Sequence, residues 1–279
     1  MDNKAFSSID WVGQCLVDNE RTRAFEKAIK KAVKPGDTVL DAGTGSGVFA
    51  LFAAQAGAAR VVSIEYDPYI ADVARRNFSV NGFTNIELRI ADARNIRFQK
   101  TDKFDVVIME MITTGMIDEA EIPALNNLYR QHAVDAETIF IPFKQETYIT
   151  LMDFPSECYG LKIPMVKHLW RWHDWSDAPM VAMTEKVLLH SVEFHKPTEE
   201  RVDTVVNARA LKTGKINAIH LSGRSCLDSD TVLSDTESIN APVVIPIEEY
   251  NIHEGETVKV RIRYTFGSGY GNFSAEVVR

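Results

Sequence analysis

One stretch of this sequence restricts the possible folds more than any other. The aliphatic run Thr38 to Ala42 leads directly into Gly43-Thr44-Gly45-Ser46-Gly47, and an apolar run from Val48 to Ala56 follows. A β-branched run that ends in glycines and passes into a helical pattern predicts a strand, a tight turn and a helix, the first unit of a doubly wound α/β domain. Taken alone, the glycine spacing would also fit an ordinary turn.

The glycine loop lacks the features of the two common phosphate-binding loops. The dinucleotide fingerprint requires a further glycine where this chain has Val48, and the P-loop requires a Gly-Lys-Ser/Thr ending that is absent. Asp41, near the carboxyl end of the strand, would repel a pyrophosphate and attract a ligand that carries an ammonium and a sulfonium group. S-adenosyl-L-methionine (AdoMet) is such a ligand.

Acidic residues also follow the next two predicted strands. Glu65 ends the strand 60–65, about 20 residues past the glycine loop, where an α/β nucleoside site hydrogen-bonds the ribose hydroxyls. Asp92 follows the strand 86–90 and is placed to accept a hydrogen bond from an adenine amino group. Because the carboxyl ends of parallel strands meet at one edge of a sheet, these acids and Asp41 predict a single cofactor site.

The glycine loop and its acidic strand ends closely resemble those of the class I AdoMet-dependent methyltransferases. The resemblance implies a Rossmann-like doubly wound sheet with AdoMet as the cofactor. It further implies cofactor contacts from Asp41, Gly43, Thr44, Gly45, Gly47, Glu65, Tyr66, Asp92 and Ala93.

A narrower resemblance begins before the first strand. Leu16-Val17-Asp18-Asn19-Glu20-Arg21-Thr22 is similar to the Leu-x-Asp-x-x-Arg-Thr of protein arginine methyltransferases, whose arginine grips the cofactor carboxylate through charge-assisted hydrogen bonds. The resemblance gives that role to Arg21. The alternative is a solvated arginine on the predicted helix 19–34, which Asp18 can cap.

Two glutamates follow the fourth predicted strand, 103–109. Glu110 and Glu119 occupy positions similar to the two glutamates that clamp the substrate guanidinium in arginine methyltransferases, and Glu110 is also expected to contact the cofactor. Two carboxylates that converge in a partly dry cleft repel each other unless a cation lies between them. A guanidinium can donate parallel hydrogen bonds to both. The alternative for Glu119 is a solvated acid favoured by the dipole of the predicted helix 120–132.

Three features of the arginine methyltransferases are missing. Positions 111–114 read Met-Ile-Thr-Thr where the family has an aromatic residue, methionine, glycine and tyrosine, so an aromatic wall over the guanidinium is absent. No Tyr-Phe-x-x-Tyr precedes the Arg21 motif, and Phe6 and Trp11 are the aromatic candidates for a lid, unless they are core residues. The Thr-His-Trp motif would fall near 236–240, where there is no histidine. These departures leave the identity of the acceptor open.

Beyond Phe143 the hydrophobic period changes to two, which predicts strands at 145–153, 186–190, 202–210, 216–221, 258–264 and 273–278. We therefore expect an AdoMet-binding Rossmann-like domain at 1–143 and an antiparallel β-domain, a barrel or a sandwich, at 144–279. The arginine methyltransferases have a similar β-barrel in this place.

A tryptophan-rich insertion is predicted near 165–178. The segment Trp170 to Trp175 contains three of the four tryptophans, and the corresponding region of arginine methyltransferases is a dimerisation arm, so a homodimer through this segment is one expectation and a plug at the domain junction is the other. His168 and His173 lack the spacing of a metal motif, and Cys15, Cys158 and Cys226 lack the spacing of a disulfide framework or zinc site. No metal is expected.

The charge balance bears on the acceptor. With 31 Lys and Arg against 39 Asp and Glu, the net charge of -8 repels phosphate backbones and favours cations. We expect an N-methyltransferase acting on a basic protein, at an arginine guanidinium, or on a cationic small molecule. RNA methylation and a non-catalytic role as an interaction protein are the alternatives. The sequence shows no signal peptide or membrane span, so a cytoplasmic location is expected.

Overall fold

The computed structural model describes residues 6–172 and 180–278, and the first half of the chain forms a five-stranded parallel sheet in the order β3-β2-β1-β4-β5. The strands are β1 (Thr38–Ala42), β2 (Arg60–Glu65), β3 (Ile86–Ile90), β4 (Val106–Met109) and β5 (Ile139–Ile141). The helical elements are α1 (Ile9–Val17), α2 (Asn19–Ala32), α3 (Val48–Gln55), α4 (Pro68–Val80), the 3-10 turn η1 (Thr114–Met116) and α5 (Glu121–Arg130). The strand order reverses between β1 and β4, which is where open α/β sheets bind their ligands.

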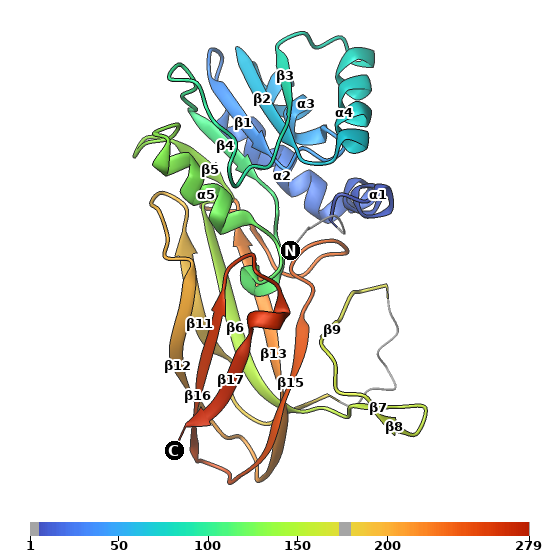
Figure 1. Cartoon of the computed structure of the whole chain (residues 1–279), viewed down its shortest axis with the longest axis vertical. Coiled ribbons are helices and arrows are strands. Elements are labelled where there is room, and N and C mark those ends of the chain that lie inside the picture. The colour runs from blue at the N-terminus through green and yellow to red at the C-terminus, as the bar shows by residue number, and fades with distance from the viewer. Residues whose placement is uncertain (1–5, 173–179, 279) are drawn as a thin grey trace.

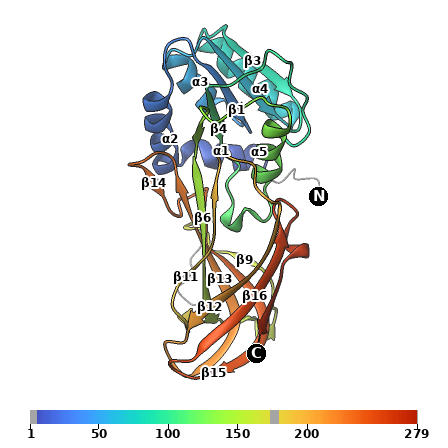
Figure 2. The same ribbon diagram turned by 90° about the vertical axis from the view of Figure 1, so that its left-hand side faces the viewer.

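Both faces of the parallel sheet are buried. Val39, Val61 and Ile108 belong to a core shared with α2, α3 and α4, whereas Leu40 and Met109 belong to a core shared with α5. This alternation follows from the two-residue repeat of a strand, and it explains why these strands read as continuous apolar runs. Figure 2 shows α2 and α5 on opposite sides of the sheet.

The second half of the chain is antiparallel (Figure 1). One sheet contains β6 (Lys144–Asp153), β9 (Lys167–His168), β10 (Val181–Ala182), β11 (Val187–Glu193), β13 (Gly214–Cys226), β14 (Val232–Leu233) and β15 (Val243–Ile252). A second sheet contains β12 (Arg201–Arg209), β16 (Thr257–Thr265) and β17 (Ser274–Val278), with the 3-10 turn η2 (Tyr270–Asn272) before its last strand. A separate hairpin pairs β7 (Glu157–Cys158) with β8 (Leu161–Lys162). The strand pairs in the described residues do not close into one hydrogen-bonded ring, so closure as a barrel is not seen there.

The two halves share one core, and the loop after β4 is held between them. Leu125 of α5 lies in the same apolar cluster as Leu221 of β13 and Val260 of β16. The Tyr264 hydroxyl donates a hydrogen bond to the Gly115 carbonyl (2.9 Å), and the Gly269 amide donates to the Ile117 carbonyl (2.8 Å). The β-rich half therefore fixes the segment that leads to Glu119.

Most of the predicted elements are present with small shifts at their ends. The helix expected at 19–34 ends at Ala32, and the one expected at 120–132 runs over Glu121–Arg130. Sequence patterns missed α1 and β15. The proposed boundary at 143 remains a prediction, although β5 ends at Ile141 and β6 begins at Lys144.

Two further checks cover only residues 6–172 and 180–278. No helix there has the length and apolar character needed to cross a membrane. In the same ranges, no group of three or more His, Cys, Asp or Glu side chains is arranged to hold a metal ion, and the three cysteines are free.

Candidate active site

A single cavity lies at the carboxyl edge of the parallel sheet and brings together most of the predicted site residues. Those that line it are Arg21, Gly43, Thr44, Gly45, Glu65, Tyr66, Asp92, Ala93, Glu110 and Glu119. Asp41 and Gly47 do not line it. Helix α1 and Phe6, which precedes it, supply another part of the wall, and Phe6 and Trp11 are the residues that the sequence offered as candidates for a lid.

The glycine loop has a backbone conformation with positive φ angles, which residues with a Cβ atom rarely adopt. Gly43, Gly45 and Gly47 have φ values of 81°, 52° and 84°. A Cβ on Gly47 would lie 2.5 Å from Cε1 of Phe78 in α4, so this glycine allows close helix packing and does not face the ligand. Gly43 and Gly45, in contrast, let the backbone form the cavity wall, as the cofactor prediction requires.

Glu65 is held at the end of β2 by backbone donors. Its two carboxylate oxygens accept hydrogen bonds from the amides of Gly45 and Asp67, both at 2.9 Å. Each carboxylate oxygen has a second acceptor site, so the predicted bonds to ribose hydroxyls can still form. Burial raises the pKa of Glu65 above its usual value.

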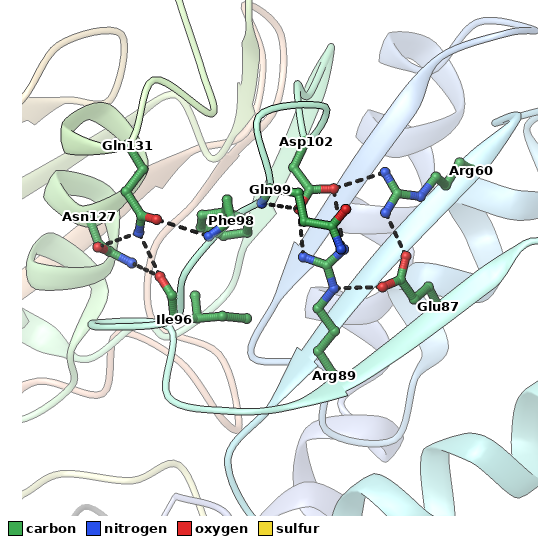
Figure 3. Close-up of polar contacts among 9 residues, drawn as sticks. All are labelled: Arg60, Glu87, Arg89, Ile96, Phe98, Gln99, Asp102, Asn127 and Gln131. Atoms are coloured by element: carbon green, nitrogen blue, oxygen red, sulfur yellow. Dashed lines mark hydrogen bonds and ion pairs between the residues drawn. The ribbon is translucent and has the colours of Figure 1, made fainter.

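Asp92 lies on the connection between β3 and β4, and Figure 3 shows the polar contacts that hold the later part of this connection, from Ile96 to Asp102. Asn127 of α5 donates to the carbonyls of Ala93 and Ile96, both at 3.0 Å. Near the end of the same connection, the Asp102 carboxylate accepts hydrogen bonds from Nη1 of Arg60 (3.0 Å) and from Nη1 of Arg89 (2.8 Å). These bonds hold the connection that carries Asp92 and Ala93 against the cavity.

The Asp92 carboxylate itself is engaged by Arg94. The Arg94 guanidinium donates from Nε (2.9 Å) and Nη2 (2.6 Å), one to each oxygen of Asp92. Burial pushes the pKa of Asp92 upward, but the bonds from Arg94 outweigh it and hold the pKa below its usual value. The role of Asp92 toward an adenine amino group stays a prediction.

Asp41 lies behind the glycine loop and is almost completely buried. Its Oδ2 has no hydrogen-bond partner among the described residues. Burial, helped by the nearby charges of Glu65 and Glu110, raises the pKa of Asp41 to about 7, although a hydrogen bond from Thr44 acts in the opposite direction. A cation bound in the adjacent cavity would favour the ionised form.

Arg21 is buried, unlike a solvated helix arginine, and it forms an ion pair with Glu110. Its Nη1 donates to the Cys15 carbonyl (2.9 Å), its guanidinium carbon lies 4.8 Å from the ring centroid of Phe49, and its Nε has no partner in the described part of the chain. The free Nε at the cavity wall leaves one donor for a ligand anion such as the cofactor carboxylate.

Asp18 precedes α2 and accepts hydrogen bonds from both halves of the chain, which fixes the start of this helix. One carboxylate oxygen caps the helix by accepting from the Arg21 amide (3.0 Å). The other accepts from the Thr236 hydroxyl (2.5 Å), the Ser238 hydroxyl (2.7 Å) and the Ser238 amide (3.0 Å). The segment that lacks the family's histidine therefore holds Asp18 directly, a contact that the sequence analysis missed.

Several acidic side chains between the end of β4 and the start of α5 are buried close to one another. Glu119 lines the cavity with Glu110, and burial followed by the charges of Glu110 and Asp118 raises the pKa of Glu119 well above its usual value. Glu121 is fully buried, and neither of its carboxylate oxygens has a hydrogen-bond partner among the described residues. Burial and the Arg21 ion pair act oppositely on Glu110, and burial prevails, so its pKa is also raised. A bound cation would relieve this repulsion.

The loop's backbone is also unusual. Gly115 and Met116 have φ values of 80° and 52°, and Met116 is buried despite a conformation that side chains rarely adopt. Hydrogen bonds from the β-rich half hold this conformation, because the Gly267 amide donates to the Met116 carbonyl (3.0 Å). Strained backbone that the surroundings fix is typical of ligand sites.

The predicted tryptophan-rich segment is only partly described. Trp170 and Trp172 stack with ring centroids 4.8 Å apart, and Trp11 of α1 meets Trp170 edge-on at 4.9 Å. Residues 173–175 of the expected dimer interface lie outside the described residues, so that interface remains a prediction.

Comparisons with known proteins agree with this architecture. The ribosomal protein L11 methyltransferase family model matches residues 20–132. An uncharacterized protein of Methanocaldococcus jannaschii is 32% identical over 257 residues, which cover 92% of this chain and 92% of that protein. A chain of the Trypanosoma brucei PRMT1 enzyme-prozyme heterotetrameric complex with AdoHcy has a TM-score of 0.74 and 16% identity, with 98% of both chains covered.

This chain is a class I AdoMet-dependent methyltransferase. It belongs to the same family as the Methanocaldococcus protein, and its two-part fold is that of the arginine methyltransferase structure. An arginine N(omega)-methyltransferase of Streptomyces achromogenes subsp. streptozoticus is 32% identical over 151 residues, covering 51% of this enzyme and 42% of that protein. The glycine loop, the acids at the strand ends and the free Arg21 Nε fit AdoMet as the cofactor of this enzyme.

Proposed function

We propose that this methyltransferase modifies a guanidinium nitrogen of a protein arginine, with Glu110 and Glu119 as the residues that hold the acceptor. The observation that carries the proposal is that both carboxylates line the cofactor cavity and are buried enough for their pKa values to be raised. Glu110 is paired with Arg21, and its charge disfavours ionisation of Glu119, so a planar cation with several donors that reaches both carboxylates would favour the ionised form of Glu119. The name of the Streptomyces relative supports an arginine guanidinium as the acceptor, and it does not say whether that arginine belongs to a protein.

The proposed chemistry depends on positioning. Bound AdoMet supplies an electrophilic methyl group on a sulfonium. The two glutamates would accept hydrogen bonds from the guanidinium and keep its positive charge on the nitrogens that face them, which leaves electron density on the nitrogen facing the methyl group. Arg21 would hold the cofactor carboxylate and thereby the direction of approach. Such a site accelerates transfer through orientation and electrostatics.

Nucleic acid is a less suitable acceptor for this cavity. The residues after β4 read Glu110-Met111-Ile112, whereas enzymes that methylate exocyclic base amines usually carry an Asn/Asp-Pro-Pro-aromatic loop there. The net charge of -8 also disfavours a phosphate backbone. A small guanidine and a protein arginine remain to be distinguished by experiment.

One experiment tests the acceptor class directly. The enzyme is incubated with AdoMet labelled in the methyl group and with a lysate separated into protein, RNA and small-molecule fractions, and the labelled fraction is hydrolysed to identify the modified residue. We expect the label in protein as methylarginine. The Glu110→Gln variant serves as the control, because it should bind AdoMet and transfer no label.

Three results would contradict the proposal. Label in RNA would show that the acceptor is a nucleic acid. Label in protein on lysine or on an amino terminus would exclude the guanidinium clamp. Label confined to a small guanidine would keep the proposed chemistry but exclude a protein as the acceptor.

A further inference from the structure

Three tryptophans from two distant segments form a continuous aromatic surface, which we call the tryptophan ladder: Trp11, Trp170 and Trp172. The rings of Trp170 and Trp172 are nearly parallel, at 6° with centroids 4.8 Å apart. Trp11 of α1 meets them edge-on, with its centroid 4.9 Å from Trp170 and 6.4 Å from Trp172. The ladder thus connects the helix over the cofactor site to the segment after β9.

The ladder leads from the active site to the surface. Trp11 lines the cavity that contains Glu110 and Glu119. At the other end, Trp172 is 44% exposed. A molecule with its reacting group in the cavity could therefore extend along aromatic rings into solvent.

The inner part of the ladder is anchored beside the acidic loop. The His168 ring stacks on Trp170 at 8° with centroids 5.7 Å apart, and His168 Nε2 lies 4.0 Å from Asp118 Oδ2. Asp118 immediately precedes Glu119. The ladder therefore comes close to the loop in which positions 111–114 lack aromatic residues, and it brings aromatic faces to this site from elsewhere in the chain.

Beside the outer end of the ladder, the described charges near Arg171 are this one cation and two carboxylates. Arg171 is neutralised by two acids, since its Nη1 lies 2.9 Å from Glu20 Oε2 and its Nε lies 3.2 Å from Asp235 Oδ2. Asp118 and Glu119 lie toward the cavity, where burial raises the pKa of both carboxyls and a bound cation would favour their ionised forms. Aromatic faces within an acidic surrounding attract Lys and Arg side chains, whose cations interact with the rings and the acids together.

We propose that the tryptophan ladder binds basic residues that flank the acceptor arginine, so that the preferred substrate is an arginine within a basic protein segment. The inference rests on the proposed function and adds a substrate class to it. Trp172 would then be a specificity residue, in contact with the neighbours of the acceptor in the substrate and not with the reacting group.

The test compares two substrates of the full-length enzyme: a short blocked peptide with one arginine flanked by lysines, and acetyl-arginine amide. In Trp172→Ala we expect KM for the peptide to rise about five-fold or more, which is the loss of one cation–π contact, with kcat unchanged. Kinetics with acetyl-arginine amide and the Kd for AdoMet should not change. Trp172→Phe should restore most of the peptide KM, because a ring face remains.

Two controls separate recognition from structure. Tyr159→Ala removes a fully exposed aromatic residue from the turn between β7 and β8 and should leave KM for both substrates unchanged. A peptide with serines in place of the lysines should give the wild-type enzyme the KM that Trp172→Ala has for the basic peptide. An unchanged peptide KM in Trp172→Ala, or an equal loss with both substrates, would overturn the inference. If the wild-type enzyme methylates neither substrate, the proposed function itself fails, and the ladder proposal fails with it.

Discussion

The Arg21 guanidinium and the Glu110 carboxylate form an ion pair in the cavity wall, although 89 positions separate them in the sequence. The sequence motifs assign Arg21 to the cofactor carboxylate and Glu110 to the acceptor cation, with a further expected contact between Glu110 and the cofactor. Because they pair with each other, a cofactor carboxylate that draws on Arg21 increases the negative charge available at Glu110. The two binding events are therefore expected to favour each other.

Replacement of Glu110 by glutamine should separate catalysis from cofactor binding. The change keeps the shape of the side chain and removes the charge that would hold the acceptor, so we expect kcat to fall by at least about 100-fold. The Kd for AdoMet should stay the same or decrease, because Arg21 loses its competing partner. Isothermal titration calorimetry and methyl-transfer assays measure the two effects. A marked loss of AdoMet affinity would show that Glu110 acts mainly on the cofactor.

Replacement of Arg21 by methionine should destabilise the fold in a pH-dependent way. Without its partner, buried Glu110 must be protonated in the folded state, so its folded pKa rises further above its unfolded value. Since the unfolded chain then binds fewer protons, stability falls as pH increases from the unfolded pKa toward the folded one. We expect a loss of about 3 kcal/mol at about pH 8 and a smaller loss at about pH 5.5.

Urea unfolding at both pH values measures the loss of stability in Arg21→Met, and the double variant Arg21→Met/Glu110→Gln is the matched control. The double variant has no carboxylate left to neutralise at this position, so its deficit should be smaller and should not grow with pH. A deficit of equal size at both pH values in the single variant would mean that Arg21 contributes through packing on Phe49 alone.

Local sequence patterns were sufficient to predict the strands of the parallel sheet and the acidic residues that follow them. The apolar runs of β1, β2 and β4 are short and bounded by glycines or acids, so their ends and the acids that follow them could be placed without knowledge of the fold. Gly47 was assigned to the cofactor because a spacing cannot tell a glycine that faces a ligand from one that packs against Phe78.

The contacts between the halves could not be predicted in this way. Asp18 was recognised as a helix cap, but its bonds to Ser238 join residues 220 positions apart, and no local pattern encodes them. Strand β15 was missed because Pro246 interrupts the alternating pattern, yet this proline pairs with Ala218 at an irregular point of the ladder. Before Leu16, helix α1 carries no motif, and only the tertiary structure reveals that Val12 and Cys15 line the cavity.

Replacement of Asp18 by alanine should affect both stability and cofactor binding. It removes a helix cap and leaves the buried donors of Thr236 and Ser238 without an acceptor, so we expect a loss of about 2–4 kcal/mol in urea unfolding. Because Arg21 lies in the first turn of α2, which Asp18 caps, AdoMet should also bind more weakly.

Asp228→Ala is the matched control for Asp18→Ala. Asp228 likewise accepts backbone hydrogen bonds, from Asp230 (2.7 Å) and Thr231 (2.8 Å), but it does not line the cofactor cavity. Its removal should cost about 1 kcal/mol and leave AdoMet affinity unchanged. Equal effects of the two substitutions on AdoMet binding would exclude a positioning role for Asp18.

The pH dependence of AdoMet binding should report on Asp41. Burial raises the pKa of this carboxyl to about 7 in the unliganded enzyme, whereas the cationic cofactor favours its ionised form. Binding then requires the loss of a proton below pH 7, so affinity should rise with pH between about 5.5 and 7, by at most ten-fold per unit. Calorimetry in two buffers with different ionisation enthalpies should detect the released proton. In Asp41→Asn this release should disappear and affinity at about pH 7 should fall by about 1–3 kcal/mol. Wild-type binding that neither changes with pH nor releases a proton would show that Asp41 stays ionised, or that it does not sense the cofactor.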